Sequence, residues 1–376
     1  MKLNEFKLER YFAKYEFMTA YNLCASDCEP LTVNELLQME EGSLLALKKQ
    51  GLGYTESAGD SDLLELISSL YNTIIPDQIL TFSGAEEAIF IFMNVLLNPR
   101  DHIIVQFPAY QSLFEIAQSI GCHVSLWELE PHHNWELNLE VLIDNITPRT
   151  RAIIINFPHN PTGTHISRQK LNQIIDIAQE NNIYLFSDEV YRLLEYNSVQ
   201  RLPATCDLYD KGVSLGVMSK AFGLAGLRIG WISTPDRELL KQFAAFKDYT
   251  TICNSAPSEF FAKIALKHVD KILERNLTII NQNRELFSGF FTNFKEFFDY
   301  IPPKAGSVAF PSFKSNVSFE QFYIDLAREK NVLLLPGTTF NYPDRYFRIG
   351  FGRKGVAGPL ELLSDFITTY SPLKEH

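Results

Sequence analysis

The chain contains 376 residues, of which 46% are hydrophobic, and its formal net charge is -11. Because a domain usually holds about 100–200 residues, this length predicts one large and one smaller domain. The acidic balance argues against nucleic acid as a partner. We find no secretory signal and no apolar run that approaches the ~20 residues of a membrane span, so we expect no membrane contact.

Five cysteines occur without the spacing of a disulfide framework, which favours reduced thiols and a cytoplasmic location. Cys24 and Cys28 are separated by three residues, but no second pair and no nearby histidine completes a set of metal ligands. We therefore expect no metal site.

Helical periodicity and short apolar segments alternate along the first two thirds of the chain. The segments with helical periodicity are 63–71, 87–97, 111–120 and 167–181, the last with Ser167 as its N-cap. The segments typical of buried strands are 79–82, 103–106, 123–127, 152–156 and 183–187. Strands that alternate with helices indicate an α/β fold with a mostly parallel sheet covered on both faces.

The pattern changes after this central region. Residues 258–298 contain few helix breakers and predict long helices that link the large domain to the small one. An alternating segment at 306–313 follows, then a predicted helix at 320–330 and a strand that bears Arg348. This mixture predicts a smaller α+β domain.

Lys220 follows an apolar stretch, and Arg228 lies eight residues further on, among small residues that allow close backbone approach. A lysine in such a setting can form a Schiff base with a cofactor aldehyde. The segment alone is weak evidence, because most lysines beside glycine-rich turns are surface residues or phosphate binders. The G-x-G-x-x-G order of dinucleotide-binding sites is absent.

Asn160 and Asp188 each follow a predicted strand, at the carboxyl end where open α/β sheets bind ligands. A carboxylate such as Asp188 can keep a pyridine nitrogen protonated, and the hydroxyl of Tyr191 can stabilise a phenolate oxygen. Each motif alone has a simpler interpretation, since Asp188 can cap the next segment and Asn160 can form a turn. Their combination and order favour a pyridoxal site.

The chain resembles the class I/II aminotransferases of the fold type I pyridoxal-phosphate enzymes over residues 23–366. The resemblance implies pyridoxal 5′-phosphate as the cofactor and a homodimer with shared active sites. By this resemblance, Lys220 would form the Schiff base with the cofactor, and Arg228 and Ser219 would bind its phosphate. Asp188 would pair with the ring nitrogen. Tyr191 and Asn160 would donate to the phenolate oxygen.

Further cofactor contacts are implied by the same resemblance. The segment Ser83-Gly84-Ala85-Glu86 opens a predicted helix whose N-terminus would bind the phosphate, and Ser83 is also interpreted as its N-cap. Tyr110 corresponds to the aromatic residue that stacks on the cofactor. Tyr54 corresponds to the tyrosine that reaches the neighbouring subunit's phosphate. Val217 departs from the pattern, because many relatives have a second serine there.

The implied substrates are an amino acid and a 2-oxo acid. Arg348 corresponds to the arginine that binds the substrate α-carboxylate, and Asn160 and Ala25 complete this site. Aspartate-specific relatives use an arginine from the segment that here spans 248–257, which contains no cation. We therefore expect a non-dicarboxylic amino donor. Three acidic residues would suit a neutral or basic side chain: Asp27, Glu29 and Asp248.

Transamination is the expected activity. The alternative is a pyridoxal-phosphate-dependent lyase or cyclase. Some relatives use the same lysine for elimination or replacement, and capreomycidine synthases use it for cyclisation. The resemblance also implies a seven-stranded, mostly parallel sheet in a large α-β-α domain over residues 46–280. The smaller α+β domain would combine residues 1–45 and 281–376.

Overall fold

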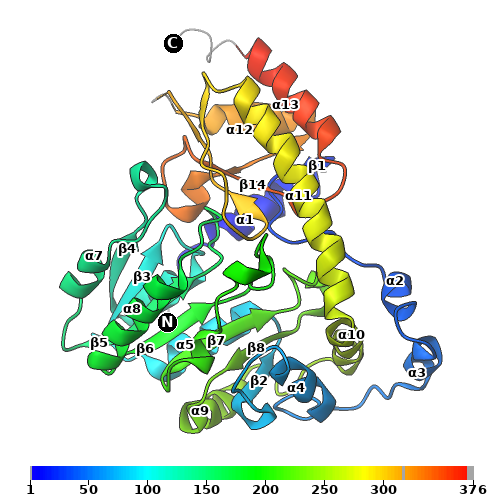
Figure 1. Ribbon diagram of the computed structural model, residues 1–376, viewed down its shortest axis with the longest axis vertical. Coiled ribbons are helices and arrows are strands. Elements are labelled where there is room, and N and C mark those ends of the chain that lie inside the picture. The colour runs from blue at the N-terminus through cyan, green and yellow to red at the C-terminus, as the bar shows by residue number, and fades with distance from the viewer. Residues whose placement is uncertain (1, 316–317, 371–376) are drawn as a thin grey trace.

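The computed structural model describes residues 2–315 and 318–370. Its centre is a sheet of seven strands in the order β2-β8-β7-β6-β5-β3-β4 (Figure 1). Within this sheet β8 is antiparallel to both neighbours, and the other neighbouring pairs are parallel. The predicted α/β class with a mostly parallel sheet is confirmed. The strands are β2 (Ile79–Phe82), β3 (His102–Phe107), β4 (His123–Glu128), β5 (Thr150–Asn156), β6 (Tyr184–Asp188), β7 (Gly212–Val217) and β8 (Gly230–Ser233).

Side chains alternate between two hydrophobic layers along the strands, as the period of two requires. On β3, Ile103 and Val105 join the layer with α5 and α9, and Ile104 joins the layer with α8. Because helices cover both faces, the central strands are buried almost throughout. The helices of this region are α4 (Ser61–Ser68), α5 (Ala85–Leu96), α6 (Ser112–Ile120), α7 (Leu139–Asp144), α8 (Arg168–Glu180), α9 (Arg237–Lys247) and α10 (Ala256–Lys267).

Two sequence-based details need correction. Ser83 is not the N-cap of α5: Gly84 holds that position, and the Ser83 N–H donates to the Glu87 carboxylate. Strands β6 and β7 are joined by loops and short 3₁₀ turns, so the strict alternation of strands and helices stops there. The predicted N-cap Ser167 is confirmed, since its hydroxyl accepts a hydrogen bond from Lys170 N–H at 3.1 Å.

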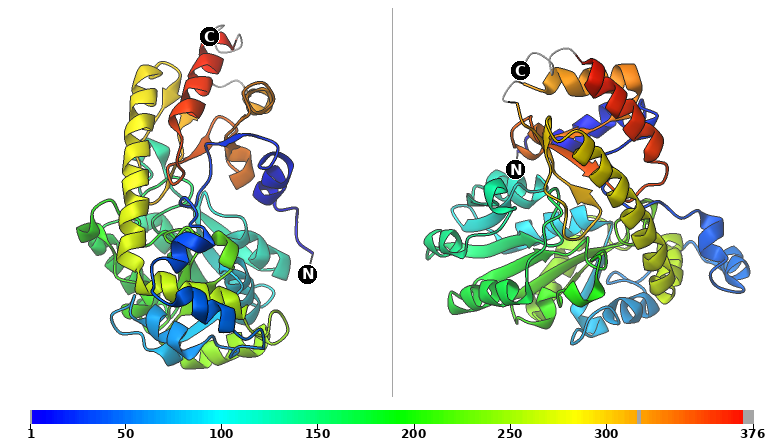
Figure 2. Two further views of the ribbon diagram at one scale, coloured as in Figure 1. Left: turned by 90° about the vertical axis from the view of Figure 1, so that its right-hand side faces the viewer. Right: turned by 45° about the horizontal axis from the view of Figure 1, so that its top comes forward.

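The long helix α11 (Val269–Asn293) runs from the sheet region to the C-terminal part of the chain (Figures 1 and 2). There β14 (Phe347–Gly350) pairs with β10 (Val308–Ala309) and β13 (Leu335–Pro336). The other elements of this part are β9 (Phe298–Asp299), β11 (Ser312–Phe313), α12 (Glu320–Lys330), β12 (Val332–Leu333) and α13 (Ala357–Thr369).

The N-terminal segment joins this C-terminal part, because β1 (Tyr21–Asn22) pairs with β12 in parallel. Helix α1 (Lys7–Tyr15) lies between this part and the sheet region (Figure 2). Helices α2 (Val33–Leu37) and α3 (Ser43–Lys49) extend along the side of the molecule near α10 (Figure 1). The domain boundaries at residues 45 and 280 stay a prediction. None of the helices in the described ranges has the length and apolarity that a membrane crossing requires.

Gly350 holds the N-terminal segment against β14. Its N–H donates to the Leu23 carbonyl at 2.8 Å, and a Cβ at this position would lie 1.8 Å from the Ala25 carbonyl oxygen. Only a residue without a side chain permits this approach. The contact matters because Ala25 and Arg348, two residues from Gly350, both border the cavity described below.

We expect Gly350→Ala to lower the free energy of unfolding by about 1–3 kcal/mol, since the added methyl must displace the 23–26 segment. Gly289→Ala is the matched control: Gly289 is an exposed residue within α11, and a Cβ there meets nothing within 4 Å. It should stabilise the protein by about 0.5–1 kcal/mol. Chemical unfolding of both variants measures the difference, and equal stability of Gly350→Ala and the unmodified protein would contradict the close approach.

Candidate active site

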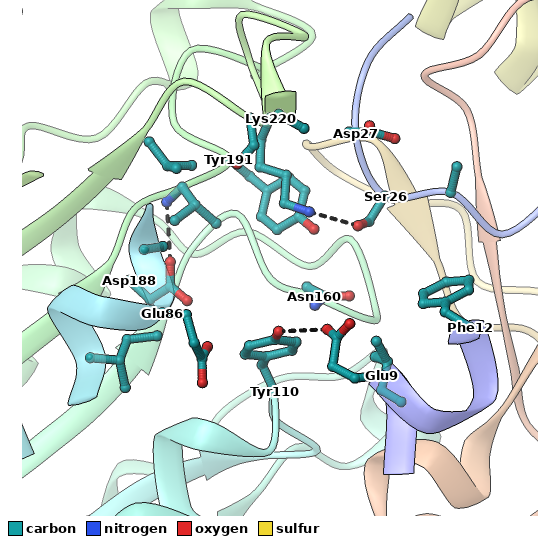
Figure 3. Close-up of a pocket in the computed structure, with 18 of the residues that line it drawn as sticks. Glu9, Phe12, Ser26, Asp27, Glu86, Tyr110, Asn160, Asp188, Tyr191 and Lys220 are labelled. Atoms are coloured by element: carbon teal, nitrogen blue, oxygen red, sulfur yellow. Dashed lines mark hydrogen bonds between the residues drawn. The ribbon is translucent and has the colours of Figure 1, made fainter. Parts of the chain in front are cut away.

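A cavity of about 580 Å³ lies between the sheet region and the N- and C-terminal segments (Figure 3). It collects most of the residues that the sequence singled out, from seven separate parts of the chain. Those that line it are Ala25, Ala85, Glu86, Tyr110, Asn160, Asp188, Tyr191, Ser219, Lys220, Arg228 and Arg348, and the departing residue Val217 is with them.

Lys220 lies three residues beyond the end of β7, and its amine points into the cavity (Figure 3). Lys220 Nζ donates a hydrogen bond to Ser26 Oγ at 2.8 Å and lies 5.6 Å from the centroid of the Tyr191 ring. Ser26 was missed by the sequence analysis, because nothing in its local pattern shows that the N-terminal segment folds back over Lys220. The amine is therefore held at the centre of the cavity by contacts from two distant segments.

Asp188 ends strand β6 and is only 5% exposed. Its Oδ1 accepts a hydrogen bond from Val190 N–H at 3.2 Å. Burial raises the pKa of this carboxyl to about 7, and the nearby Lys220 charge offsets only part of that effect. A carboxyl in this state gains most from a ligand that brings a cationic N–H to it.

Tyr191 is 1% exposed, and its hydroxyl has no hydrogen-bond partner in the part of the chain that the structure describes. An unpartnered buried hydroxyl costs about 1–3 kcal/mol, so the position favours a ligand that supplies a polar atom. Asn160 lies on the same side of the cavity (Figure 3), and its backbone N–H donates to Asn156 Oδ1 at 2.8 Å. The turn is thereby anchored to the end of β5.

The N-terminus of α5 and the Arg228 guanidinium meet at one end of the cavity. A Cβ at Gly84 would lie 2.5 Å from Arg228 Nη2, so a glycine is required for this approach. The first N–H groups of a helix lack partners within it, and together with a guanidinium they favour a phosphate. Ser219 borders the same space, and Val217 places an apolar surface where a second hydroxyl was expected.

Arg348 is 2% exposed and lies on β14. Its Nε and Nη2 donate to the Cys24 carbonyl at 3.1 and 2.9 Å, and its Nη1 donates to Asn160 Oδ1 at 3.1 Å. All of these partners are neutral. A buried guanidinium without a counter-charge favours a bound carboxylate, which it can hold through two hydrogen bonds.

Tyr110 reaches the cavity from the start of α6, and its hydroxyl donates to Glu9 Oε1 at 2.9 Å (Figure 3). Glu9 belongs to α1, which also brings Phe12 to the cavity, with Glu16 at the C-cap of the helix. The sequence analysis did not consider α1 as part of the site, since an amphipathic helix carries no signal of its tertiary position.

Tyr54 does not line the cavity and is 89% exposed. Of the three acids expected near the substrate, Asp27 borders the cavity, but its carboxylate pairs with Arg353 at 2.8 Å. Glu29 accepts a hydrogen bond from Lys354 N–H at 2.9 Å, and neither Glu29 nor Asp248 lines the cavity. The acidic surface of the site thus comes from residues other than those expected.

The sequence pattern of the family "Aminotransferase class I and II" matches residues 19–355. The chain belongs to this family. Its similarity to capreomycidine synthase of Streptomyces vinaceus is 28% identity over 368 residues, which cover 97% of this chain and 94% of that protein. Two solved structures agree over 98% of the chain: a pyridoxal-phosphate-dependent aminotransferase from Streptococcus suis (32% identity, 99% of that chain, TM-score 0.93) and the pyridoxal-phosphate-dependent cyclase OrfR (27% identity, 98% of that chain, TM-score 0.90).

The protein is therefore an enzyme of the pyridoxal-phosphate-dependent aminotransferase class, and pyridoxal 5′-phosphate is its cofactor. The residues present fit that cofactor, since the cavity offers an amine, a buried carboxyl, an unpartnered hydroxyl and a phosphate-binding helix end. When bound, pyridoxal phosphate supplies an aldehyde for the amine and an electron-poor ring that accepts electrons from the substrate α-carbon.

The raised pKa of Asp188 predicts a pH-dependent stability in protein prepared without cofactor. The folded state keeps this proton up to about pH 7, whereas the unfolded chain releases it near pH 4, so the free energy of unfolding falls as the pH rises between these values. The contribution of Asp188 is at most about 1.4 kcal/mol per pH unit.

Asp188→Asn should lack this contribution, so the stability difference between the two proteins should change across the window. Chemical unfolding at pH 4.5, 5.5 and 6.5, chosen as roughly even steps within that window, measures the difference. Cofactor should remove the effect, because a protonated ring nitrogen stabilises the Asp188 carboxylate. A difference that stays constant with pH in the protein without cofactor would contradict the assignment.

Proposed function

We propose that this protein catalyses transamination of a non-dicarboxylic amino acid to a 2-oxo acid, with Lys220 as the residue that binds the cofactor and moves the proton. The carrying observation is the position of the Lys220 amine, which faces the cavity between the Tyr191 ring and Ser26 Oγ. Lys220 would hold the cofactor aldehyde, and its amine, when released by a substrate amine, would take a proton from the substrate α-carbon. Ser26 keeps the amine within reach.

The other residues take roles that follow from their surroundings. Asp188 keeps the ring nitrogen protonated, because a cationic N–H stabilises the anion of a carboxyl whose pKa burial raises to about 7. Tyr191 and Asn160 donate to the phenolate oxygen, and Tyr110 lies against the ring. The phosphate is bound by Arg228, Ser219 and the segment Ser83-Gly84-Ala85-Glu86.

Substrate binding is assigned to Arg348, which holds the α-carboxylate, with Asn160 and Ala25 beside it. The cations that line the cavity within the described residues are Lys220, Arg228 and Arg348, and each has a role of its own. A second carboxylate of a dicarboxylic donor would thus face the acidic residues of α1 without a counter-charge. Such an arrangement disfavours aspartate and glutamate.

Elimination or cyclisation is the second candidate, because the chain aligns over nearly its whole length with a capreomycidine synthase and with a cyclase. Both activities begin with the same proton transfer by Lys220. They differ afterwards, since a lyase or cyclase regenerates its cofactor without a 2-oxo acid acceptor.

A panel of amino acids tests the function. We expect cofactor-loaded protein without an acceptor to release at most one 2-oxo acid per subunit, with aspartate among the poorest donors. Product is measured by derivatisation of 2-oxo acids, with ammonia measured in parallel. Lys220→Ala should lower the rate by several orders of magnitude, because no other described residue places an amine at this point. Continued turnover with ammonia release would instead establish a lyase, and consumption of the amino acid without release of 2-oxo acid or ammonia would establish a cyclase. Aspartate as the best donor would overturn the proposed preference.

We also propose a homodimer in which Tyr54 completes the partner's phosphate site. Thr55 Oγ1 and Ser57 Oγ donate to carbonyl oxygens of Asn254 and Ile252 at 3.3 and 2.9 Å, so two loops lie side by side. Their neighbours Tyr54 and Tyr249 are strongly exposed aromatic residues. Exposed apolar groups on adjacent loops are typical of an interface.

We also propose that the protein is cytoplasmic.

Hybrid dimers distinguish shared from separate sites. One chain carries Tyr54→Phe and the other Lys220→Ala. If sites are shared, one of the two sites in the hybrid combines intact Lys220 with intact Tyr54, and its cofactor affinity equals that of the unmodified protein. Activity measured at limiting cofactor should then be about half that of the unmodified dimer, as one of two sites survives. If the hybrid instead keeps the cofactor affinity of the Tyr54→Phe homodimer, Tyr54 acts within its own subunit.

A further inference from the structure

We propose that the α1 side of the cavity binds the cationic side chain of an amino-acid substrate, with Glu9 and Glu16 as its counter-charges and Phe12 as the surface beneath it. This inference rests on the proposed function, because it assumes that an amino acid is held in the cavity by Arg348. It goes further by assigning the residues that select the substrate side chain.

Helix α1 divides its charges between two surfaces. Residues 9, 12 and 16 are spaced by three and four positions, so their side chains lie on the same face of α1. Residue 16 is the C-cap of the helix. That face lines the cavity, and Figure 3 shows Glu9 and Phe12 directed into it opposite Lys220. The basic residues of the same helix lie elsewhere and line a separate surface groove: Lys7, Arg10 and Lys14.

The two carboxylates have only neutral hydrogen-bond partners among the residues described. Glu9 accepts from the Tyr110 hydroxyl at 2.9 Å, and Glu16 accepts from Asn22 Nδ2 at 3.4 Å. Neither forms an ion pair within the described ranges, whereas Asp27 nearby is neutralised by Arg353. Burial and the neighbouring Asp27 carboxylate raise the pKa of Glu16, and the Arg353 and Arg348 charges offset only part of this effect.

Two observations mark the cavity beside this surface as a ligand site. The buried Tyr191 hydroxyl lacks a partner, which the cofactor would supply, and the buried Arg348 guanidinium has neutral partners only, which favours a carboxylate. Arg348 Cζ lies 5.9 Å from the centroid of the Phe12 ring. An amino acid whose α-carboxylate is bound by Arg348 can therefore place its side chain beside Phe12. From there a long side chain can reach the Glu9 and Glu16 carboxylates.

A guanidinium or an ammonium group fits this surface. Its aliphatic stem packs on the Phe12 ring, and its cationic head gains charge-assisted hydrogen bonds from Glu9 and Glu16. A carboxylate would be repelled by both residues. A neutral side chain would contact Phe12 and leave both carboxylates without a counter-charge.

Two pairs of amino acids test the charge alone: L-arginine against L-citrulline, and L-lysine against L-norleucine. The side chains of each pair have similar length, and only the side chain of the first member carries a positive charge. We expect the charged member of at least one pair to be preferred by about 10- to 100-fold in kcat/KM, as a charge-assisted hydrogen bond predicts. Preference in the first pair identifies a guanidinium substrate, and in the second an ammonium substrate. No preference in either pair overturns the proposal.

Glu9→Gln and Glu16→Gln keep the shape of the side chains and remove the charge. Each should reduce kcat/KM for the preferred cationic substrate by about 10-fold and leave its neutral counterpart and alanine nearly unchanged. Glu5→Gln is the matched control, because Glu5 precedes the same helix, is exposed and does not line the cavity. An equal loss for alanine in the two variants would show a structural effect and overturn the assignment.

A binding measurement separates this inference from the proposed function. Rapid mixing of cofactor-loaded protein with each amino acid, followed through the absorbance of the bound cofactor, separates the initial binding step from the slower proton transfer and yields dissociation constants. If no amino acid releases a 2-oxo acid or ammonia, the proposed function fails, yet tighter binding of the charged members still supports the acidic surface. Equal dissociation constants within both pairs would reject it even if transamination occurs.

Discussion

The buried guanidinium of Arg348 connects the three parts of the chain on which the site depends. It lies on β14 and donates to the Cys24 carbonyl of the N-terminal segment and to Asn160 at the end of β5. Burial of an unpaired charge is unfavourable, so these hydrogen bonds strongly restrict where the segments can lie. The cost that remains is recovered when a carboxylate binds, which links the architecture of the site to its affinity for amino acids.

Charge is distributed unequally along the cavity. Arg228 and the N-terminus of α5 make one end suitable for a phosphate, whereas Glu9 and Glu16 make the α1 side acidic. Lys220 lies beside the Tyr191 ring. A zwitterionic ligand with a cationic side chain matches this order of charges, and a dicarboxylate does not. If the proposed roles hold, this distribution of charge would orient an amino acid in the cavity.

Small residues permit the close contacts that bring these groups together. Gly84 lets the Arg228 guanidinium lie against the start of α5, and Gly350 lets the 23–26 segment lie against β14. A methyl group at either position would meet another atom within 2.5 Å. The Gly350 contact is with backbone and therefore restricts where Ser26 lies relative to Arg348, whereas the Gly84 contact concerns the Arg228 side chain at the other end of the cavity.

The sequence by itself determined the local features. Apolar strand segments, the N-cap Ser167, and the polar residues that follow β5 and β6 could be identified because periodicity and strand ends depend on neighbours in the chain. The alternation of strands and helices predicted the mostly parallel sheet. The motifs around Asn160, Asp188 and Lys220 carried the family resemblance, which implied seven strands.

Only the tertiary structure decided what covers the cavity. The sequence of α1 is that of an ordinary amphipathic helix. Its residues that line the cavity precede Lys220 by about two hundred residues in the chain. Asp27 lines the cavity as the sequence suggested, but its charge is neutralised by Arg353, a partner 326 residues away. Local patterns carry no information on such pairings, because long-range packing selects the neighbours whose charges remain uncompensated.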